Sequence, residues 1–408
     1  MAKKVYGECF GCTLNRGEYY SALAQLEERG WDIVCDSEGA DLCLIFGCVV
    51  IDKTERRVKK RIEDLKMRGG RVVVGGCLAP FYDGEKIYPA FTKCDADGIE
   101  FRGVAGSSRI VAGVTGIVPI STGCPLNCSY CATKLARGGL KSYPLDLVVG
   151  DVAECVRGGA KEIFLTSQDC GAWGIDSGGT IVDLVERISH LKGDFMVRVG
   201  MMNPAFVDGS IIGKVFEQNH IFRFLHVPLQ SGSDEVIGRM NRFYTVEGFI
   251  STVAEYRRRF GDGVLSTDVI VGFPGETAGD FRKTVETVEE IRPDVLNITR
   301  FSHRPGTKAY EMDDRIHGRI AKERSRYLTS LAKRIGAEIN SRWIGEKVKV
   351  LITEKGKEGK EKEWMGRTVN YKPVVLDGED GGLGKWVKTR ICDITSSYLI
   401  GERCTSLG

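Results

Sequence analysis

The chain has 408 residues, a length that allows two or three domains, each with its own core. With 42% hydrophobic and 28% charged residues, it has the composition of an ordinary globular protein, and a formal net charge of only +3 does not by itself point to a nucleic-acid partner. No apolar run approaches the length of a membrane span, and the first residues, MAKKVYGECFGC, become polar too early for a secretion signal. We therefore expect a cytoplasmic protein with no membrane partner, whose 14 cysteines bind metal rather than form disulfides.

The first hundred residues alternate between strand and helix patterns, which predicts a small α/β domain with a parallel sheet. Three apolar runs end at Cys12, Cys48 and Cys77, each directly after a glycine, with helices expected over 19–27 and from about residue 53. The carboxyl ends of parallel strands meet at one edge of a sheet, where ligand sites form. We therefore expect the three Gly-Cys steps to meet in space. The alternative is three buried structural cysteines, because a free cysteine packs as a small hydrophobe.

A longer series of strand and helix patterns follows a Gly/Ser-rich crossing near 103–116. Strand-like runs occur at GIVPIST, KEIFLTS, DFMVRVG, FRFLHVP, GVLSTDVIVG and DVLNITR, with helical patterns between them, for example over 145–157, 181–191 and 279–291. Six βα units predict a partial barrel whose functional residues lie in the loops at the carboxyl ends of the strands.

The last part of the chain changes to short alternating segments, EKVKVLITEK, GRTVNYKPVVLDG and KWVKTRICDITSSYLIG, with EKGKEGKEKE as a hairpin tip. This pattern predicts a small all-β barrel. The predicted fold class is therefore α/β: an N-terminal parallel-sheet domain over 1–108, a central partial (β/α)6 barrel over 109–342, and a C-terminal all-β barrel over 343–408.

Three closely spaced cysteines, Cys124, Cys128 and Cys131, lie in GCPLNCSYC, directly after the first predicted barrel strand. A zinc site would need a fourth ligand, but no CxxC or HxxxH pattern follows nearby in the sequence. The Cys-x3-Cys-x2-Cys spacing instead suits three irons of one 4Fe–4S cluster. The fourth iron would then be open to S-adenosylmethionine, and one electron from the cluster would break its sulfonium bond and release a 5′-deoxyadenosyl radical.

Taken in order, these segments resemble the radical S-adenosylmethionine methylthiotransferases. The likeness covers nearly the whole chain: the Gly-Cys triad, GCPLNCSYC followed by ARGGLKSYP, LTSQD, HVPLQSGSDEVIGRMNRFY, TDVIVGFPGET, RPGT, and a final barrel with GRTVNY that resembles a TRAM domain. The resemblance implies two 4Fe–4S clusters, one held by Cys124, Cys128 and Cys131 and an auxiliary one held by Cys12, Cys48 and Cys77. It also implies two equivalents of S-adenosylmethionine per turnover, as methyl and radical source, a sulfur source, and an electron donor such as a ferredoxin or flavodoxin.

Four further residues are predicted to bind S-adenosylmethionine. Family members place an aromatic residue near the adenine at the position of Tyr130, and Gln168, Gln230 and Arg242 are plausible partners for the amino, ribose and carboxylate groups. The alternative for each polar residue is a structural cap or salt bridge.

Other residues near these motifs are expected to be structural. We expect His226 to be packed and hydrogen-bonded, and Arg137 and Ser142 to order the loop that leaves the cluster. Cys9 lies three residues before Cys12 and would point to the opposite face of a regular strand. The remaining cysteines are interpreted as core or surface residues: 35, 43, 94, 155, 170, 392 and 404.

The substrate is predicted from LTSQDCGAWGID and RVGMMNP, which are most similar to the archaeal and eukaryotic threonylcarbamoyladenosine group. This resemblance implies methylthiolation at carbon 2 of N6-threonylcarbamoyladenosine, next to the anticodon of a tRNA. The alternatives in the family are isopentenyladenosine in tRNA and an aspartate of a ribosomal protein. The threonyl carboxylate would need a cation, preferably a bidentate arginine, for which Arg300 and Arg304 are candidates.

Local charge favours an RNA partner, although a solvated helix face explains each basic stretch equally well. Residues 53–71 contain nine Lys or Arg against three Asp or Glu, and residues 315–342 contain eight against two. The last segment, 343–408, has twelve basic and ten acidic residues, whereas a basic ribosomal protein would favour an acidic barrel. Two other classes remain open: a non-catalytic iron–sulfur RNA-binding protein, and a radical enzyme that transfers only methyl groups.

Overall fold

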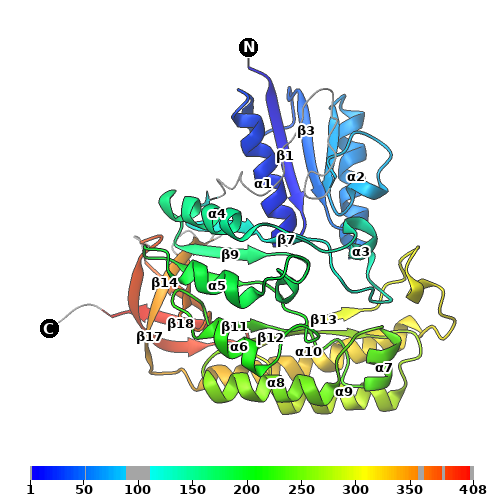
Figure 1. Cartoon of the computed structure of the whole chain (residues 1–408), viewed down its shortest axis with the longest axis vertical. Helices are drawn as coiled ribbons and strands as arrows, with labels where there is room; N and C mark the ends of the chain where they lie inside the picture. Colours follow the sequence, from blue (N-terminus) through cyan, green and yellow to red (C-terminus); the bar gives the residue numbers. More distant parts are fainter. Residues whose placement is uncertain (1, 51, 89–110, 357–362, 379–381, 405–408) are drawn as a thin grey trace.

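The computed structural model describes residues 2–50, 52–88, 111–356, 363–378 and 382–404, which form three units (Figure 1). An α/β domain lies at the top of Figure 1, a partial barrel in the centre, and a small β-barrel at the left. The predicted α/β fold class is confirmed. The expected domain boundary at 108–109 lies outside the described residues, as does Cys94. No helix in the described part of the chain combines the length and apolar composition of a membrane span.

The N-terminal sheet contains four parallel strands in the order β2 (Asp32–Val34), β1 (Lys4–Phe10), β3 (Leu42–Gly47) and β4 (Val72–Gly76). One face of the sheet is covered by α1 (Thr13–Glu27) and the other by α2 (Asp52–Met67). Successive side chains of β3 point to opposite faces and therefore pack against different helices. Leu44 packs in the core that includes α1, and Ile45 packs in the core that includes α2. The edge strand β2 was not predicted, since its three residues are not buried and give no apolar run.

All six predicted strands of the central barrel are present and parallel. They are β6 (Thr115–Pro119), β9 (Glu162–Thr166), β10 (Met196–Val199), β11 (Phe224–His226), β12 (Val264–Val271) and β13 (Val295–Arg300). Two sheets, β10-β9-β6 with the short antiparallel β5 (Val111–Ala112) and β11-β12-β13, are joined by one bridge between Val197 and Ile221. The structure therefore confirms a six-unit partial barrel.

Helices surround these strands as the βα pattern predicts (Figure 1). They are α4 (Leu145–Arg157), α5 (Ile181–Ser189), α6 (Gly209–Phe216), α7 (Asp234–Arg239), α8 (Val246–Arg259), α9 (Ala278–Ile291) and α10 (Gly318–Ser341). The predicted helix over 145–157 is found with the same bounds, and those over 181–191 and 279–291 differ by one or two residues at one end, where capping rather than periodicity sets the limit. The barrel interior and these helices, except α7, share one large apolar core.

The C-terminal unit is a closed barrel with the strand order β14-β15-β16-β18-β17. Its strands are β14 (Lys347–Lys355), β15 (Glu363–Thr368), β16 (Pro373–Asp377), β17 (Trp386–Ile394) and β18 (Leu399–Arg403). The predicted all-β barrel is thus confirmed, while residues 357–362 of the expected hairpin tip lie outside the described residues.

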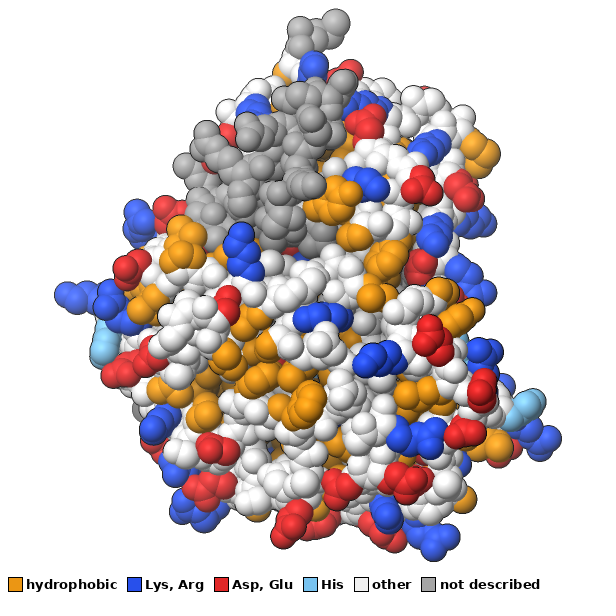
Figure 2. All heavy atoms as spheres, turned by 45° about the vertical axis from the view of Figure 1, so that its right-hand side comes forward, with side chains coloured by type: hydrophobic (Ala, Val, Ile, Leu, Met, Phe, Trp, Pro, Cys, Tyr) orange, Lys and Arg blue, Asp and Glu red, His pale blue; other side chains and the backbone are white. Residues whose placement is uncertain are grey.

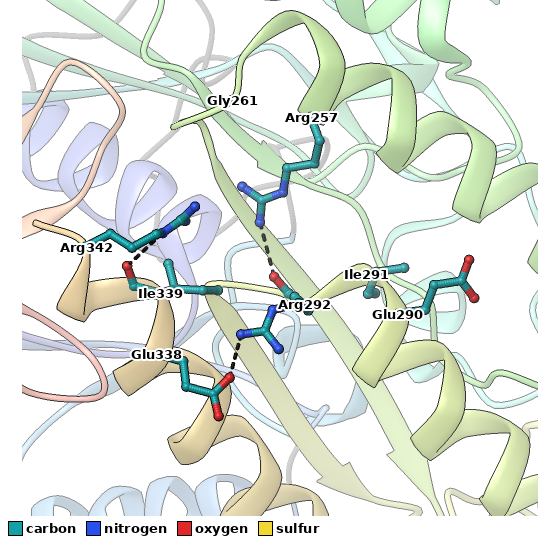
Figure 3. A pocket seen from close by; sticks show the side chains of 8 residues that line it. All are labelled: Arg257, Gly261, Glu290, Ile291, Arg292, Glu338, Ile339 and Arg342. Carbon is teal, nitrogen blue, oxygen red and sulfur yellow. Dashed lines mark hydrogen bonds and ion pairs between the residues drawn. The ribbon is translucent and has the colours of Figure 1, made fainter.

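This small barrel is seated on the amino ends of the central strands. Tyr371 packs with Phe224 and Val264, the first residues of β11 and β12, and the Lys372 ammonium lies 2.6 Å from the carboxylate of Asp294 just before β13. Beside this junction, a pocket of about 290 Å³ lies between the ends of α8, α9 and α10 (Figure 3). Arg292 pairs there with Glu338 at 2.6 Å, so we interpret this pocket as part of the structural junction.

Candidate active site

A cavity of about 900 Å³ lies between the N-terminal domain and the carboxyl ends of the barrel strands. Its wall includes all six cysteines of the two predicted triads, together with the four residues predicted to contact S-adenosylmethionine. Residues from widely separated regions of the sequence therefore meet at one place, as the parallel-strand argument requires. Their roles as ligands stay predictions.

The dispersed triad is positioned by three strand ends. Cys12 is the residue before α1, Cys48 follows β3, and Cys77 follows β4. Gly76 has a φ of +73°, and a Cβ there would lie 3.0 Å from the Gly47 carbonyl oxygen, so the turn into Cys77 requires glycine. Burial raises the pKa of the Cys77 thiol to about 12, although the nearby Arg137 opposes this shift.

The compact triad lies in the loop between β7 (Ser121–Thr122) and α3 (Ala132–Arg137). This loop is closed at its base, because β7 pairs with β8 (Lys141–Ser142), and the Cys131 amide donates to the Cys128 carbonyl at 3.1 Å. Ser142 accepts a 2.9 Å hydrogen bond from the Gly174 amide, as expected for a residue that orders the outgoing chain. Burial also raises the pKa of Cys124 to about 12.

Arg137 joins the two triads across the domain boundary. It ends α3, which begins directly after Cys131, yet its Nε donates to the Cys77 Sγ at 3.0 Å. Its two terminal nitrogens donate to both carboxylate oxygens of Glu18 on α1 at 2.6 and 2.9 Å, and Nη2 also donates to Asn15 at 2.7 Å. The side chains of Arg137 and Glu18 are 0% and 2% exposed, so this is a buried ion pair. Arg137 therefore does more than order its own loop.

Two polar residues on the cavity wall, Arg242 and Gln230, are held in defined conformations. Arg242 Nη1 donates to the Tyr130 hydroxyl at 2.9 Å, and its guanidinium lies 5.0 Å from the Tyr244 ring centroid. Gln230 has a φ of +64°, a strained conformation for a residue other than glycine and one that concentrates at functional sites.

Several buried polar atoms on the cavity wall have no hydrogen-bond partner among the described residues. They are Gln168 Oε1, Asp169 Oδ2, Gln230 Oε1, and Nε and Nη2 of Arg242. Acceptors and donors side by side fit a ligand such as S-adenosylmethionine, which carries an ammonium, hydroxyls and a carboxylate. The six cysteines are free of disulfides, as cluster ligands must be. In the described part of the chain, no three Cys, His, Asp or Glu side chains lie close enough to hold a single metal ion.

Asp169 is a site residue that the sequence reasoning missed. Its Oδ1 accepts hydrogen bonds from the Gly171 and Asn203 amides at 3.1 and 3.0 Å, while Oδ2 faces no partner among the described residues. Burial raises the pKa of Asp169 to about 6 despite these bonds and the charge of Arg242. The available signal was an acidic residue at the end of a barrel strand, in the same LTSQD segment that led to Gln168.

Cys9 also differs from its expectation, since it lines the same cavity as Cys12. The strand β1 ends at Phe10, so strict alternation does not extend to Cys12. Burial, as the larger cause, and the charge of the nearby Cys12, as the smaller one, raise the pKa of Cys9 to about 12. The other single cysteines are as expected: 43, 155 and 170 are buried, and 35, 392 and 404 are at least partly exposed.

An adjoining cavity of about 230 Å³ shares Tyr130, Cys131 and Gln230 with the first one. Arg300 and Arg304, the two candidate carboxylate partners, both line it. Arg304 Nη1 donates to Glu55 of α2 at 2.5 Å, and its Nε and Nη2 are buried without a partner among the described residues.

His226, expected to be hydrogen-bonded, contacts the carboxylate of Asp268 at 3.0 Å through Nε2, on the wall of the adjoining cavity. Burial alone would raise the pKa of Asp268, but the His226 contact and the Asn297 amide, whose Nδ2 donates at 2.8 Å, lower it below its ordinary value.

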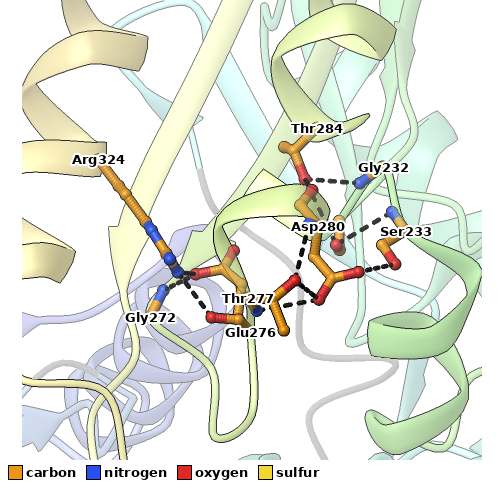
Figure 4. A network of polar contacts seen from close by, with 9 residues as sticks. Gly232, Ser233, Gly272, Glu276, Thr277, Asp280, Thr284 and Arg324 are labelled. Carbon is orange, nitrogen blue, oxygen red and sulfur yellow. Dashed lines mark hydrogen bonds and ion pairs between the residues drawn. The ribbon is translucent and has the colours of Figure 1, made fainter. Parts of the chain in front are cut away.

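Two of the sequence motifs form one buried polar network behind the site (Figure 4). Ser233 of PLQSGS donates to Asp280 at 2.6 Å, and the Gly232 amide donates to Thr284 at 2.9 Å. Glu276 of GFPGET accepts from the Gly272 amide at 2.6 Å and pairs with Arg324 of α10. This network fixes the loops after β11 and β12 and therefore the position of Gln230.

Three family models match successive parts of the chain. Residues 4–96 match an uncharacterised protein family designated UPF0004, residues 118–288 match the radical SAM superfamily, and residues 341–403 match the TRAM domain. Two proteins named probable threonylcarbamoyladenosine tRNA methylthiotransferase are similar over almost their whole length. The protein from Archaeoglobus fulgidus is 38% identical over 97% of each chain, and that from Pyrococcus abyssi is 39% identical over 98% of this chain and 99% of its own.

The chain belongs to the threonylcarbamoyladenosine tRNA methylthiotransferase family. The family extends to eukaryotes, since a member from Drosophila pseudoobscura is 32% identical over 98% of this chain and 77% of its own. Among solved structures, the radical S-adenosylmethionine methyltransferase TsrM from Kitasatospora setae covers 76% of this chain and 77% of its own, with a TM-score of 0.56 at 14% identity. That likeness shows a shared fold.

Proposed function

We propose that this protein is a radical S-adenosylmethionine enzyme that methylthiolates carbon 2 of N6-threonylcarbamoyladenosine in tRNA. The observation that carries the proposal is the convergence of both cysteine triads on one cavity, in a chain with full-length similarity to proteins of that name. The matches to the UPF0004, radical SAM and TRAM families along the chain support the same function.

In this proposal each triad holds a 4Fe–4S cluster through thiolates. Cys124, Cys128 and Cys131 hold the one that binds S-adenosylmethionine, and the triad formed by Cys12, Cys48 and Cys77 holds the auxiliary one. The clusters and S-adenosylmethionine supply the radical, the methyl group and the sulfur when bound. Because burial raises the pKa of Cys77 and Cys124, both thiols release a proton when they bind iron.

The residues of the chain are proposed to bind and orient the cofactor. Arg242, which donates to Tyr130, offers a carboxylate two nitrogens that have no partner among the described residues, and the Gln168 and Gln230 side-chain oxygens offer acceptors to an ammonium or hydroxyl. Asp169 offers one more acceptor oxygen on the same wall. These complementary charges support two-sided recognition of an amino-acid headgroup.

The threonylcarbamoyl group is proposed to extend into the adjoining cavity. Arg300 and Arg304 there are the cations available to its carboxylate, and Arg304 keeps two nitrogens free of partners among the described residues. Isopentenyladenosine carries no carboxylate and would leave the two buried nitrogens of Arg304 without an acceptor among the described residues. An electron donor such as a ferredoxin or flavodoxin, a sulfur source and a cytoplasmic location complete the proposal.

Mass spectrometry of tRNA nucleosides tests the function. Cells that lack their own enzyme and express this protein should accumulate 2-methylthio-N6-threonylcarbamoyladenosine, and cells that express a Cys128→Ala variant should not. A methylthio derivative of isopentenyladenosine instead would contradict the substrate. Absence of 5′-deoxyadenosine after anaerobic reconstitution with S-adenosylmethionine and dithionite would contradict radical catalysis altogether.

A further inference from the structure

The helix α2 begins at the rim of the large cavity. Val50, Thr54 and Arg57, from the end of the preceding loop and the first two turns of α2, all line this cavity. Val50 and Arg57 are exposed as well, so the cavity opens to solvent along this edge. The guanidinium of Arg57 lies 5.2 Å from the Phe10 ring centroid, which holds it at the opening.

One face of α2 carries positive charge that acidic residues do not balance. Lys53, Arg57 and Lys60 are spaced i, i+4 and i+7, so they share one face, and all three are exposed. No ion pair of these three cations occurs among the described residues. We call them the α2 stripe. Since the rise is ~1.5 Å per residue, Lys53 and Lys60 are ~10 Å apart along the helix axis.

Two of the four acidic residues of α2 are paired with other cations: Asp52 pairs with Arg56, and Glu55 contacts both Lys59 at 2.7 Å and Arg304 at 2.5 Å. The other two, Glu63 and Asp64, lie one turn beyond Lys60. Residues 53–71 contain nine Lys or Arg against three Asp or Glu, so positive charge remains in local excess, although the whole chain is nearly neutral. Figure 2 shows several Lys and Arg side chains along the right-hand edge of the upper part of the molecule, with Asp and Glu side chains between them.

A further exposed cation lines the adjoining cavity. Arg300 ends β13, is exposed, and lines the adjoining cavity together with Val50. It has no ion pair among the described residues, so positive charge is also present at the adjoining cavity, where the threonyl carboxylate is proposed to bind.

The TRAM barrel, by contrast, lies at the other end of the central strands. It packs at Val264, the first residue of β12, whereas the cavities lie beyond the carboxyl end of that strand. Eight residues of strand span roughly 25 Å. Nucleotides that flank a base inserted into the cavity are therefore closer to α2 than to the TRAM barrel.

We propose that the α2 stripe binds the phosphate backbone of the RNA strand that carries the target nucleoside. This inference rests on the proposed function, in which the substrate is a tRNA. Exposed Lys and Arg side chains bind phosphates without reading sequence, and such contacts weaken as salt rises because bound counterions are released. The stripe thus holds the flanking nucleotides while the cavity holds the modified base.

The test compares two doubly neutralised forms of the reconstituted holoenzyme. Lys53→Gln with Lys60→Gln removes two charges from the stripe and leaves Arg57 on the cavity wall intact. The matched control, Lys322→Gln with Lys333→Gln, removes two exposed lysines from α10, no residue of which lines either cavity. Equal iron content and thermal midpoint verify that each form is folded.

Affinity for substrate tRNA, measured by fluorescence anisotropy across a salt series, gives the result. We expect the α2 variant to bind roughly tenfold more weakly and the slope of log K against log salt to fall by about 1.5 to 2, whereas the α10 variant stays within about twofold. The two single substitutions in α2 should each show about half the change in slope.

Three outcomes would overturn the inference: unchanged tRNA affinity in the α2 variant, an equal loss in the α10 variant, or unchanged affinity with slower reduction by an acidic flavodoxin. The last result would assign the stripe to a protein partner. Each is distinct from failure of the proposed function, which would show as absence of the methylthiolated nucleoside with the unchanged protein.

Discussion

At the scale of single residues, the buried pair between Arg137 and Glu18 is the most consequential contact of the site. Both side chains are removed from water, and the arginine also donates to Cys77. Burying two charges costs solvation energy, which is offset only when the two groups pair with good geometry. The two parallel hydrogen bonds between Arg137 and Glu18, at 2.6 and 2.9 Å, have that geometry. The same hydrogen bond to sulfur would stabilise the reduced form of a cluster held by Cys77.

We predict that Arg137→Met destabilises the protein by about 3–5 kcal/mol, because the Glu18 carboxylate is left buried without its arginine. The double change Arg137→Met with Glu18→Met should be less harmful, since no buried charge then loses its partner. Chemical unfolding of the apoprotein measures both. A double variant as unstable as the single one would contradict the role of charge. In the holoenzyme, Arg137→Lys should lower the reduction potential of the proposed auxiliary cluster, because the hydrogen bond from Nε to the Cys77 sulfur is lost. A redox titration monitored by electron paramagnetic resonance measures this potential.

A second residue-scale prediction concerns Asp294, which lies between the central barrel and the TRAM barrel. Burial would raise its pKa, but Lys372 and Arg257 lower it below the ordinary value. A carboxyl with a lowered pKa stabilises the folded state above its unfolded pKa of about 4, and this contribution is lost as the pH falls through the lower folded value. Asp294→Asn should therefore lower the thermal midpoint at pH 7, and the difference from the unchanged protein should shrink below about pH 4.

The exposed Asp262 provides the control for that experiment. Asp262→Asn should change the stability by less than about 0.5 kcal/mol at any pH, as for most surface substitutions. A difference between Asp294→Asn and the unchanged protein that stays constant down to pH 3 would contradict the assigned role of the Asp294 charge.

At the scale of elements, the loop after β11 depends on its contact with α9. A Cβ at Gly232 would lie 2.6 Å from the Lys283 carbonyl oxygen and 2.6 Å from the Thr284 Cα, both of which are backbone atoms. The loop could then no longer approach the helix, and Gln230, two residues earlier, would shift. The PLQSGS motif is thus explained by packing as much as by polar chemistry.

We predict that Gly232→Ala destabilises the protein by about 1–3 kcal/mol and weakens S-adenosylmethionine binding to the holoenzyme, because the added methyl group forces the loop away from α9. Gly238→Ala in α7 is the matched control. No atom of the described residues outside its own helix turn lies within 4 Å of the methyl group that alanine would add there, and alanine favours a helix by about 0.8–1 kcal/mol. Scanning calorimetry gives the stability of each variant, and titration calorimetry gives its affinity for S-adenosylmethionine. Tight binding by Gly232→Ala would show that Gln230 does not depend on this contact.

At the scale of the whole molecule, two domains supply different halves of one chamber. The N-terminal sheet contributes Cys12, Cys48 and Cys77, and the central barrel contributes the compact triad and the polar wall. Arg137 and Arg304 tie the two domains together on either side of the cavity, through Glu18 and Glu55. Apolar packing also crosses the boundary, because Ala132 and Ala136 of α3 belong to the core beneath α2, so the ion pairs and this packing together set the relative position of the triads.

We predict that Cys48→Ala lowers the iron content of the reconstituted enzyme by about half and abolishes methylthiolation, while cleavage of S-adenosylmethionine continues at the other triad. Cys43→Ala, on the strand β3 that precedes Cys48, is the control: Cys43 is buried in the core and does not line the cavity, so this variant should retain full iron content. Iron analysis and mass spectrometry of 5′-deoxyadenosine and tRNA nucleosides provide the measurements. Methylthiolated product from Cys48→Ala would remove the auxiliary triad from the mechanism.

The sequence by itself determined the three-part fold and the gathering of the cysteines. Long apolar runs predicted the six barrel strands, and a parallel sheet brings its strand ends together whatever the details of packing. Only the tertiary structure revealed the edge strand β2, the Asp169 oxygen that has no partner among the described residues, the hydrogen bond from Arg137 to Cys77, and the position of the TRAM barrel at the amino ends of the central strands. These depend on contacts between residues far apart in the chain, and local periodicity carries no information about which distant side chains will meet.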